Sequence, residues 1–161
     1  MSTTLPGSLF SPSLCVNCVK VKQERVHDWL QELEQEFLPP IYSSVDIRDA
    51  GFKVAVVDTN IFPAGFNNLC EHGVADSVRF IRQAVEKRAP GAKNILIVAE
   101  EHTRNTWYLE HLRVLRTIIQ DAGYTVTLAT FLEVQPAFCQ DATNVELETA
   151  TGQTVKIYCF K

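Results

Sequence analysis

The sequence predicts an α/β domain built on a parallel β-sheet in three layers, with a leading helix and a C-terminal β-hairpin. Two observations predict this fold class. Short apolar, β-branched runs alternate with amphipathic stretches through the middle of the chain, as in parallel strands joined by right-handed helical crossovers. The last part of the chain instead has two alternating runs around a short turn, a pattern typical of a hairpin.

A leader and a long helix come first. Residues 1–16 contain many Ser, Thr and Pro residues, so we expect a loose leader there and assign 17–161 to the α/β domain. A helix is predicted over about 17–37, because apolar residues spaced i, i+4, i+7 and i+11 share one face. These residues are Val26, Leu30, Leu33 and Phe37. The prolines that follow end the helix, since proline lacks the amide donor.

The remaining elements follow from length and periodicity. Buried strands are expected at 52–57, 95–98 and 124–130, helices at 74–85 and 108–119, and the hairpin strands at 145–149 and 154–160. Gly123 follows the last helix, where glycine commonly ends a helix. The sequence therefore predicts a strand–helix–strand–helix–strand core followed by a hairpin.

Composition excludes several classes of protein. The chain has 161 residues and a net charge of −4, so neither nucleic acid nor an anionic membrane is an expected partner. No apolar stretch approaches the roughly 18 residues needed to span a bilayer. The five cysteines form no disulfide-like framework, which favours a reducing cytoplasm. No Walker A or G-x-G-x-x-G motif is present, so no nucleotide-binding device is recognisable.

Two polar segments follow predicted strands, at 58–68 and 100–105. Ligands of open α/β sheets bind beyond the carboxyl ends of the strands, so both segments are candidates for a binding site. In the first, Asp58 and three asparagines can form a polar pocket wall, or an Asx-type turn in which these side chains bond nearby amides. Gly65 between aromatic residues indicates unusual backbone dihedrals or a close approach.

The second segment opens the third helix and suits an anionic small molecule. Thr103 or Asn105 can cap the helix, whose free amides make a positive end. Arg104 offers a bidentate fork for a carboxylate or phosphate, and His102 can donate or accept a proton near neutral pH. The structural alternative is that the polar residues only cap the helix while Arg104 pairs with one of the two preceding glutamates.

The cysteines give a weaker signal. Cys15 and Cys18 form a C-x-x-C pair, and Cys70 and His72 are further possible ligands, but a structural zinc site needs four ligands and nothing in the spacing requires one. A redox C-x-x-C should follow a strand, whereas a Ser- and Pro-rich leader precedes this pair. Plain apolar packing is the ordinary alternative for free cysteines, and we predict no metal site.

Three motifs in order resemble the proteobacterial glutamate–cysteine ligase family. They are the runs at 42–53 and 57–69, and Glu101-His102-Thr103-Arg104-Asn105 followed by Tyr108-Leu109-Glu110. Together they extend the resemblance from about residue 25 to the end of the sequence, which makes the signal far more specific than any single motif.

The resemblance implies ligation of the γ-carboxyl group of L-glutamate to L-cysteine, the first step of glutathione biosynthesis. ATP and Mg²⁺ are the family's cofactors, and the carboxylate is expected to pass through an acyl phosphate. In plan the family is similar to ATP-grasp ligases, whose leading α/β domain contributes to the substrate pocket while later domains hold ATP and metal. Family members are much longer than this chain, so it is expected to bind neither cofactor alone and to be inactive alone.

The resemblance also suggests site residues, with no individual catalytic role assigned. Arg104 is the expected carboxylate clamp. The other expected substrate-binding residues are His102, Asn60, Asn67, Asn68, Asn105, Asp58 and Arg48. Expected partners are glutamate, cysteine and a chain that carries the missing ATP-binding domain.

Two other functions remain open. The first is a non-catalytic module, from a truncated ligase, that binds an amino acid or dipeptide. The second is a PIN-type magnesium-dependent ribonuclease, because those domains also open with a strand followed by Asp-Thr-Asn. Such a nuclease would need carboxylates to converge on Asp58 and hold metal ions. The candidates are Glu100, Glu101, Asp121 and Asp141.

Overall fold

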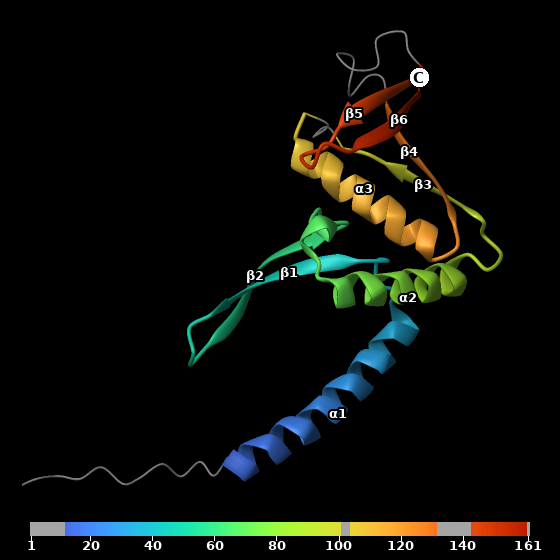
Figure 1. Ribbon diagram of the computed structural model, residues 1–161. Coiled ribbons are helices and arrows are strands. Elements are labelled where there is room, and N and C mark those ends of the chain that lie inside the picture. The colour runs from blue at the N-terminus through green and yellow to red at the C-terminus, as the bar shows by residue number, and fades with distance from the viewer. Residues whose placement is uncertain (1–11, 101–103, 132–142, 161) are drawn as a thin grey trace, which may run out of the picture. The chain divides into compact units, whose positions relative to one another are not determined.

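The computed structural model of the chain describes residues 12–100, 104–131 and 143–160, with side chains described from residue 22 onward. The chain divides into two compact units, Met1–Pro40 and Ile41–Lys161. Each unit is described by itself. Figure 1 shows the helices and strands of both units.

The first unit contains the helix α1, Pro12–Glu36. It begins five residues before the predicted start and ends close to the predicted end. Its predicted apolar face is largely exposed, with Val26 at 51% and Phe37 at 63%. Among the residues that the structure describes, no helix is long and apolar enough to cross a membrane.

The second unit is built on a four-stranded sheet in the order β3-β4-β6-β5. The strands are β3 (Asn94–Val98), β4 (Thr125–Phe131), β5 (Asn144–Glu148) and β6 (Thr154–Phe160). β3 and β6 both pair parallel with β4, and β5 pairs antiparallel with β6. The predicted hairpin and two of the predicted parallel strands are therefore confirmed.

The helix α3 (Thr106–Asp121) lies against this sheet, and α2 (Glu71–Arg88) packs against α3. One apolar cluster joins α3 to β4 and β6, with Leu112, Leu128 and Ile157 each at most 2% exposed. A second cluster joins α2, α3 and the start of β4. Because both clusters include α3, this helix is the most buried element of the unit and holds its own side chains in fixed positions.

The C-terminal end of α3 is closed in the predicted way. Gly123 has a φ of 98°, a conformation that glycine adopts without the steric cost of a Cβ atom. The guanidinium group of Arg82 on α2 donates hydrogen bonds to the carbonyl oxygens of Ala122 and Asp121, at 3.0 and 3.2 Å. These bonds satisfy carbonyls at the helix end and join α2 to α3.

The prediction that the first strand, at 52–57, is buried in the parallel sheet is wrong. β2 (Val54–Ile61) pairs antiparallel with β1 (Ser43–Asp49) in a separate two-stranded ribbon, outside the parallel sheet. It is not buried, since Val54 and Val56 are each 61% exposed. An apolar, β-branched run is compatible with a strand in either kind of sheet. Here a tight turn at Gly51, with a φ of 82°, reverses the chain, so that β2 pairs with the segment that precedes the turn.

The ribbon has one largely polar face and one face that carries most of its apolar side chains, because residues paired directly across two strands point to the same side. Its register shifts between Asp46 and Ile47, which leaves Val57 without a direct partner. The polar face carries Ser44, Asp46, Arg48, Asp58 and Asn60, with Ala55 opposite Arg48. The other face carries Val45, Ile47, Val54, Val56 and Ile61, with Ser43, Asp49 and Thr59 among them. The ribbon therefore presents a continuous polar strip.

The mixed α/β class is confirmed, while the three-layer arrangement and the likeness to ATP-grasp ligases stay predictions. Helix α3 covers one face of the four-stranded sheet. Side chains on the other face are exposed within the described part of this unit. They include Leu96, Val98, Phe131, Tyr158 and Phe160.

Candidate functional site

A strained loop follows β2 and leads into the short helix η1 (Phe66–Asn68). Phe62 has a φ of 56° and Gly65 a φ of 133°, so the predicted unusual dihedrals at Gly65 are confirmed. A positive φ is costly for a phenylalanine and persists only where surrounding contacts enforce it. Tyr42 supplies one such contact, with its ring edge-on to the ring of Phe62 at 5.1 Å.

The imidazole of His111, on α3, anchors this loop. Its Nδ1 accepts hydrogen bonds from the backbone amides of Gly65 and Phe66, at 3.1 and 3.3 Å. His111 is only 3% exposed, and burial lowers its pKa below the ordinary 6.5. The ring is therefore neutral at pH 7, and because Nδ1 accepts, its proton lies on Nε2.

A cavity of about 450 Å³ lies beside this loop, within the range of small-molecule sites. We name it the acidic cavity. Its polar lining consists of Tyr42, Ser44, Asp46, Asn60, Glu100, Tyr108 and His111. These residues come from the polar face of the ribbon, the end of β3 and one face of α3, so the cavity lies where three elements converge.

A second cavity, of about 300 Å³, is also lined by this loop. We name it the asparagine cavity. It is lined by Ala64, Gly65, Asn67, Asn68, Asn105, Trp107, Tyr108 and His111. Ala64, Tyr108 and His111 line both cavities, so the two cavities adjoin at the anchored loop and at α3.

Two tyrosines of the acidic cavity stay protonated at neutral pH. The pKa of Tyr42 is raised from 10.0 to about 12, mainly by burial and to a smaller extent by the nearby Tyr108 and Glu100. Burial also raises the pKa of Tyr108, although the hydrogen bond from the Glu100 amide to its hydroxyl, at 2.8 Å, acts in the opposite direction. Both hydroxyl groups can therefore donate hydrogen bonds to a ligand.

Comparison with known proteins identifies the family. The family model described as GshA, glutamate-cysteine ligase, matches residues 17–161. The chain belongs to the glutamate–cysteine ligase family. No curated protein matches the sequence.

A solved structure supports the same relationship. A protein from Methylobacillus flagellatus KT that carries the provisional name gamma-glutamylcysteine synthetase resembles this chain with a TM-score of 0.80 and 34% sequence identity. The match covers 100% of this chain and 37% of that one. This ligase-family chain therefore spans little more than a third of that relative's length.

Four of the predicted site residues lie at the two cavities. Asn60 lines the acidic cavity, and Asn67, Asn68 and Asn105 line the asparagine cavity. Asp58 lines neither cavity. Its carboxylate instead accepts hydrogen bonds from the Thr59 amide, at 2.9 Å, and from the Asn60 side chain, at 3.1 Å. This local bonding agrees with the turn-like alternative for Asp58.

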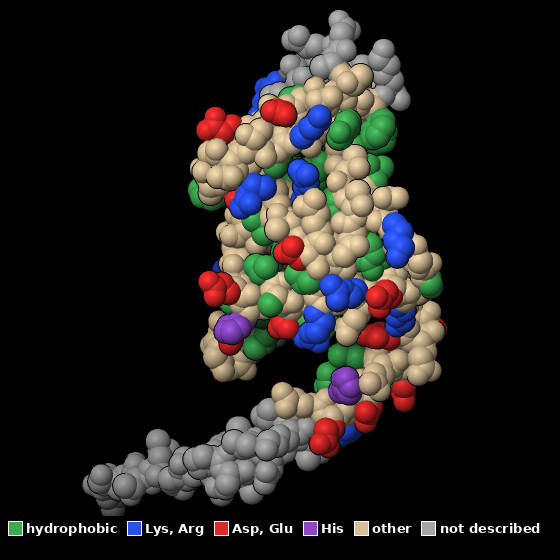
Figure 2. Space-filling view, turned by 45° about the vertical axis from the view of Figure 1, so that its right-hand side comes forward, with side chains coloured by type: hydrophobic (Ala, Val, Ile, Leu, Met, Phe, Trp, Pro, Cys, Tyr) green, Lys and Arg blue, Asp and Glu red, His purple; other side chains and the backbone are tan. Residues whose placement is uncertain are grey.

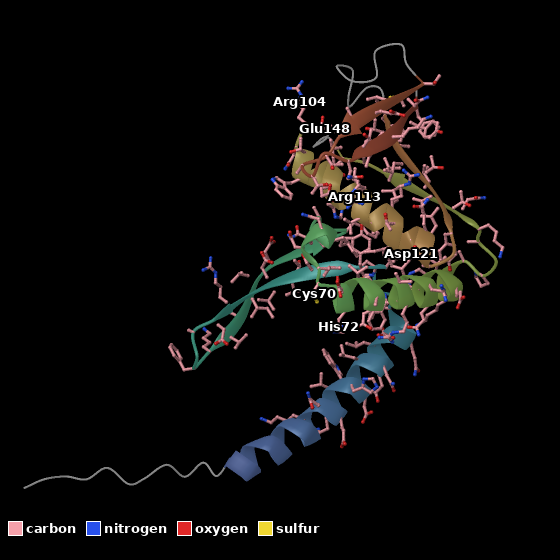
Figure 3. The ribbon with its side chains drawn as sticks, viewed as in Figure 1. Cys70, His72, Arg104, Arg113, Asp121 and Glu148 are labelled. Carbon is pink, nitrogen blue, oxygen red and sulfur yellow. The ribbon has the colours of Figure 1, made fainter. Side chains whose placement is uncertain are left out.

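Neither of the predicted arginines lines either cavity. Arg48 is exposed on the polar face of the ribbon. Arg104 is exposed and forms no hydrogen bond or ion pair with the described residues, and its side chain extends outward from the N-terminal end of α3 (Figure 3). The alternative in which Arg104 pairs with Glu100 therefore does not hold. His102 lies outside the described residues.

Asn105 caps α3, as predicted. Its Oδ1 accepts hydrogen bonds from the amides of Trp107 and Tyr108, at 3.0 and 3.4 Å. The other capping candidate, Thr103, lies outside the described residues. The cap fixes the first turn of the helix and with it Tyr108, which lines both cavities.

Replacing Asn105 with alanine should lower the free energy of unfolding by about 1 kcal/mol, because two amides lose their acceptor. Urea unfolding measures this loss. Asn105→Asp keeps the acceptor and should unfold like the parent chain. An alanine variant as stable as the parent would contradict the capping role.

Sequence reasoning missed the two most buried polar side chains of α3. Charged residues flank His111 in the sequence, a pattern typical of a solvated side chain, but the structure buries it. Glu110 is 3% exposed. Its carboxylate bonds to Arg113 at 2.6 Å and to the Thr151 hydroxyl at 2.7 Å. The helical spacing of His111 from Tyr108 and Leu115, i−3 and i+4, was a signal that could have placed it on the buried face.

The structure gives no evidence for a catalytic or metal-binding role of the cysteines whose side chains it describes. Cys70 is free and exposed just before α2, close to His72 (Figure 3). Cys159 on β6 is disulfide-bonded, which the sequence analysis did not expect. The side chains of Cys15 and Cys18 lie outside the described ones. In the described parts of the chain, no group of three or more His, Cys, Asp or Glu side chains could hold a metal ion.

The surface charge agrees with the modest net charge. On the face shown in Figure 2, acidic and basic side chains are interspersed rather than gathered by sign. Such a mixed surface gives no long-range attraction for a highly charged polymer on that face.

Proposed function

We propose that the protein containing this chain joins the γ-carboxyl group of L-glutamate to the amine of L-cysteine in an ATP-dependent reaction. The match of the family model to residues 17–161 carries this proposal. In it, this chain supplies part of the amino-acid pocket, with the two cavities beside the loop at 62–65 as the binding surface. The reaction would be the first step of glutathione biosynthesis, in the cytoplasm.

The lining of the two cavities does not suit ATP and Mg²⁺. Triphosphate binding calls for cations or a run of free amides, whereas no lysine or arginine lines either cavity within the described residues. The same residues include no cluster of acidic or histidine side chains that suits a metal. We therefore assign both cofactors to the remainder of the ligase, whether it lies in the same polypeptide or in a partner chain, and we expect this chain alone to be inactive.

Arg104 remains our proposed carboxylate clamp. It is exposed at the start of α3, so it would engage a substrate that extends beyond the cavities. Arg104→Ala should weaken binding of the carboxylate substrate in the complete ligase by about 1.5–3 kcal/mol, the typical contribution of a charged hydrogen bond. Calorimetric titration measures this loss, with Arg79→Ala on α2 as a control for loss of an exposed arginine. Equal affinities of the two variants would exclude the clamp.

The proposed activity is tested by isolating, from its own cells, the protein that contains this sequence. The isolated protein should form γ-glutamylcysteine and ADP only when glutamate, cysteine and ATP are all present. The 161-residue chain alone should form neither product. ADP release that requires neither amino acid, or no product from the native protein, would reject the proposal.

A binding module without chemistry is the second candidate. The chain spans 37% of its structural relative, which leaves room for the reacting part of the ligase to be absent. A native protein of 18.1 kDa that binds glutamate or γ-glutamylcysteine without turnover would favour this alternative. For the ribonuclease alternative, no carboxylate cluster forms around Asp58 in the described parts, and Asp121 lies at the far end of α3.

A further inference from the structure

We infer that the acidic cavity holds the α-ammonium group of glutamate. This inference rests on the proposed function, because it assigns one end of one substrate to that site. It goes further by naming a ligand group and by choosing between the two amino acids.

The charge of the lining supports a cationic group. Asp46 and Glu100 are its two carboxylates, and no lysine or arginine accompanies them among the described lining residues. Asp58 lies directly opposite Asp46 on the polar face of the ribbon, and like charges in that position repel each other. A bound ammonium group would relieve this repulsion, since an opposite charge within about 4 Å is favourable even near the surface.

Asp46 is available for such a ligand. Its carboxylate forms no hydrogen bond or ion pair with any residue in the described part of the chain. Arg48 lies two positions further along the same ribbon face but makes no ion pair with it. Asp58, in contrast, already accepts two hydrogen bonds. Asp46 is thus the carboxylate of the ribbon whose acceptors are open toward the cavity.

A second, independent feature of the cavity indicates a ligand that also has an acceptor group. His111 is 3% exposed and lines the cavity. Its Nδ1 is used by the loop, whereas its Nε2 has no hydrogen-bond partner among the described residues. This N–H is free to donate to a ligand in the cavity, and the carboxylate of an amino acid would accept its hydrogen bond. Carboxylate acceptors and an imidazole donor in one cavity match a zwitterion.

The same charges select glutamate over cysteine. The amine of cysteine is the nucleophile of the proposed ligation, so it must lose its proton before it attacks. Nearby carboxylates stabilise an ammonium and raise its pKa, which opposes that loss. The α-ammonium group of glutamate takes no part in the reaction and stays charged. An acidic subsite therefore suits glutamate.

The test is calorimetric titration of the 161-residue chain with four ligands. They are L-glutamate, glutarate, L-cysteine and 3-mercaptopropionate, so that each amino acid is paired with its analogue lacking the ammonium group. Glutarate should bind about 10- to 100-fold more weakly than glutamate, as expected for loss of a charged hydrogen bond. Cysteine should bind more weakly than glutamate. Equal affinities for glutamate and glutarate would overturn the inference.

Asp46→Asn and Asp76→Asn form the matched pair of variants. Both residues are exposed, and the ion pair of Asp76 with Arg79, at 2.8 Å, lies on the surface, where such pairs add little stability. Both variants should therefore keep the thermal midpoint of the parent chain, and Asp76 lines neither cavity. Asp46→Asn should lose about 10- to 100-fold in glutamate affinity and keep its glutarate affinity. Unchanged glutamate affinity in Asp46→Asn would overturn the assignment.

The outcomes separate this inference from the proposed function. If the native protein makes γ-glutamylcysteine but the chain does not distinguish glutamate from glutarate, the inference fails and the function stands. If the chain binds glutamate through Asp46 but the native protein makes no product, the inference stands and the proposed ligase activity fails.

Discussion

Replacing His111 with leucine is expected to release the loop at 62–65 and to lower the free energy of unfolding by about 2–4 kcal/mol. The imidazole accepts hydrogen bonds from the amides of Gly65 and Phe66, and each amide left without an acceptor costs about 1–3 kcal/mol. Urea unfolding measures the loss of stability, and amide hydrogen exchange at Gly65 and Phe66 should be faster in the variant.

His111→Asn is the matched control. Its side-chain oxygen can replace Nδ1 as an acceptor, while the Nε2 donor is lost. This variant should recover most of the stability lost in His111→Leu but bind glutamate more weakly than the parent chain. If both variants are equally unstable, the ring acts by packing rather than by anchoring the loop.

The anchor also predicts a pH dependence. Burial lowers the pKa of His111 below 6.5, so below pH 6.5 the unfolded chain binds a proton that the folded chain does not. Stability is therefore complete above pH 6.5 and falls as the pH drops toward the folded-state pKa. Titration of the ring resonances by NMR measures that pKa directly, and a value above 6.5 would contradict the buried, neutral imidazole.

Replacing Glu110 with glutamine is expected to lower the free energy of unfolding at pH 7 by about 1–2 kcal/mol, after allowance for solvent screening. The hydrogen bond from Arg113 lowers the pKa of Glu110 from 4.5 to about 2, helped by Thr149 and Thr151 and opposed by burial. The carboxylate therefore joins α3 to the turn between β5 and β6. Arg113 is 34% exposed at its side chain, which keeps the effect modest.

Acid separates this effect from simple loss of packing. Because the folded-state pKa of Glu110 is depressed, its contribution is full above pH 4.5 and is lost as the pH falls toward 2. The stability difference between the parent chain and Glu110→Gln should therefore shrink between about pH 5 and pH 2. Glu86→Gln, an exposed site on α2, should show no such change. A difference that is independent of pH would exclude the ionic contact.

Much of the fold could be predicted from the sequence because local patterns determine it. Apolar spacing located α2, α3, β3 and β4, and alternation around a turn located the β5–β6 hairpin. The ribbon could not be placed in this way. The apolar run that forms β2 looks the same in a buried parallel strand and in an exposed antiparallel one, and only the pairing with β1 distinguishes them.

The site was predicted only in part, again because local patterns do not report contacts between distant segments. Asn60, Asn67, Asn68 and Asn105 were found because they follow a predicted strand or open a predicted helix, where ligands of α/β domains bind. The roles of Asp46 and His111 depend on contacts between segments far apart in the sequence, such as the 46-residue separation between Gly65 and His111. No local pattern reports such contacts.

The most direct test of the central claim, that glutamate binds beside the loop anchored by His111, is chemical-shift mapping of the ¹⁵N-labelled chain. Addition of L-glutamate should shift amide resonances at Asp46, Asn60, Gly65 and His111, while an equal concentration of glutarate should shift them far less. The same shifts with glutarate would contradict the claim. So would glutamate-dependent shifts confined to segments that line neither cavity, or no shifts at all.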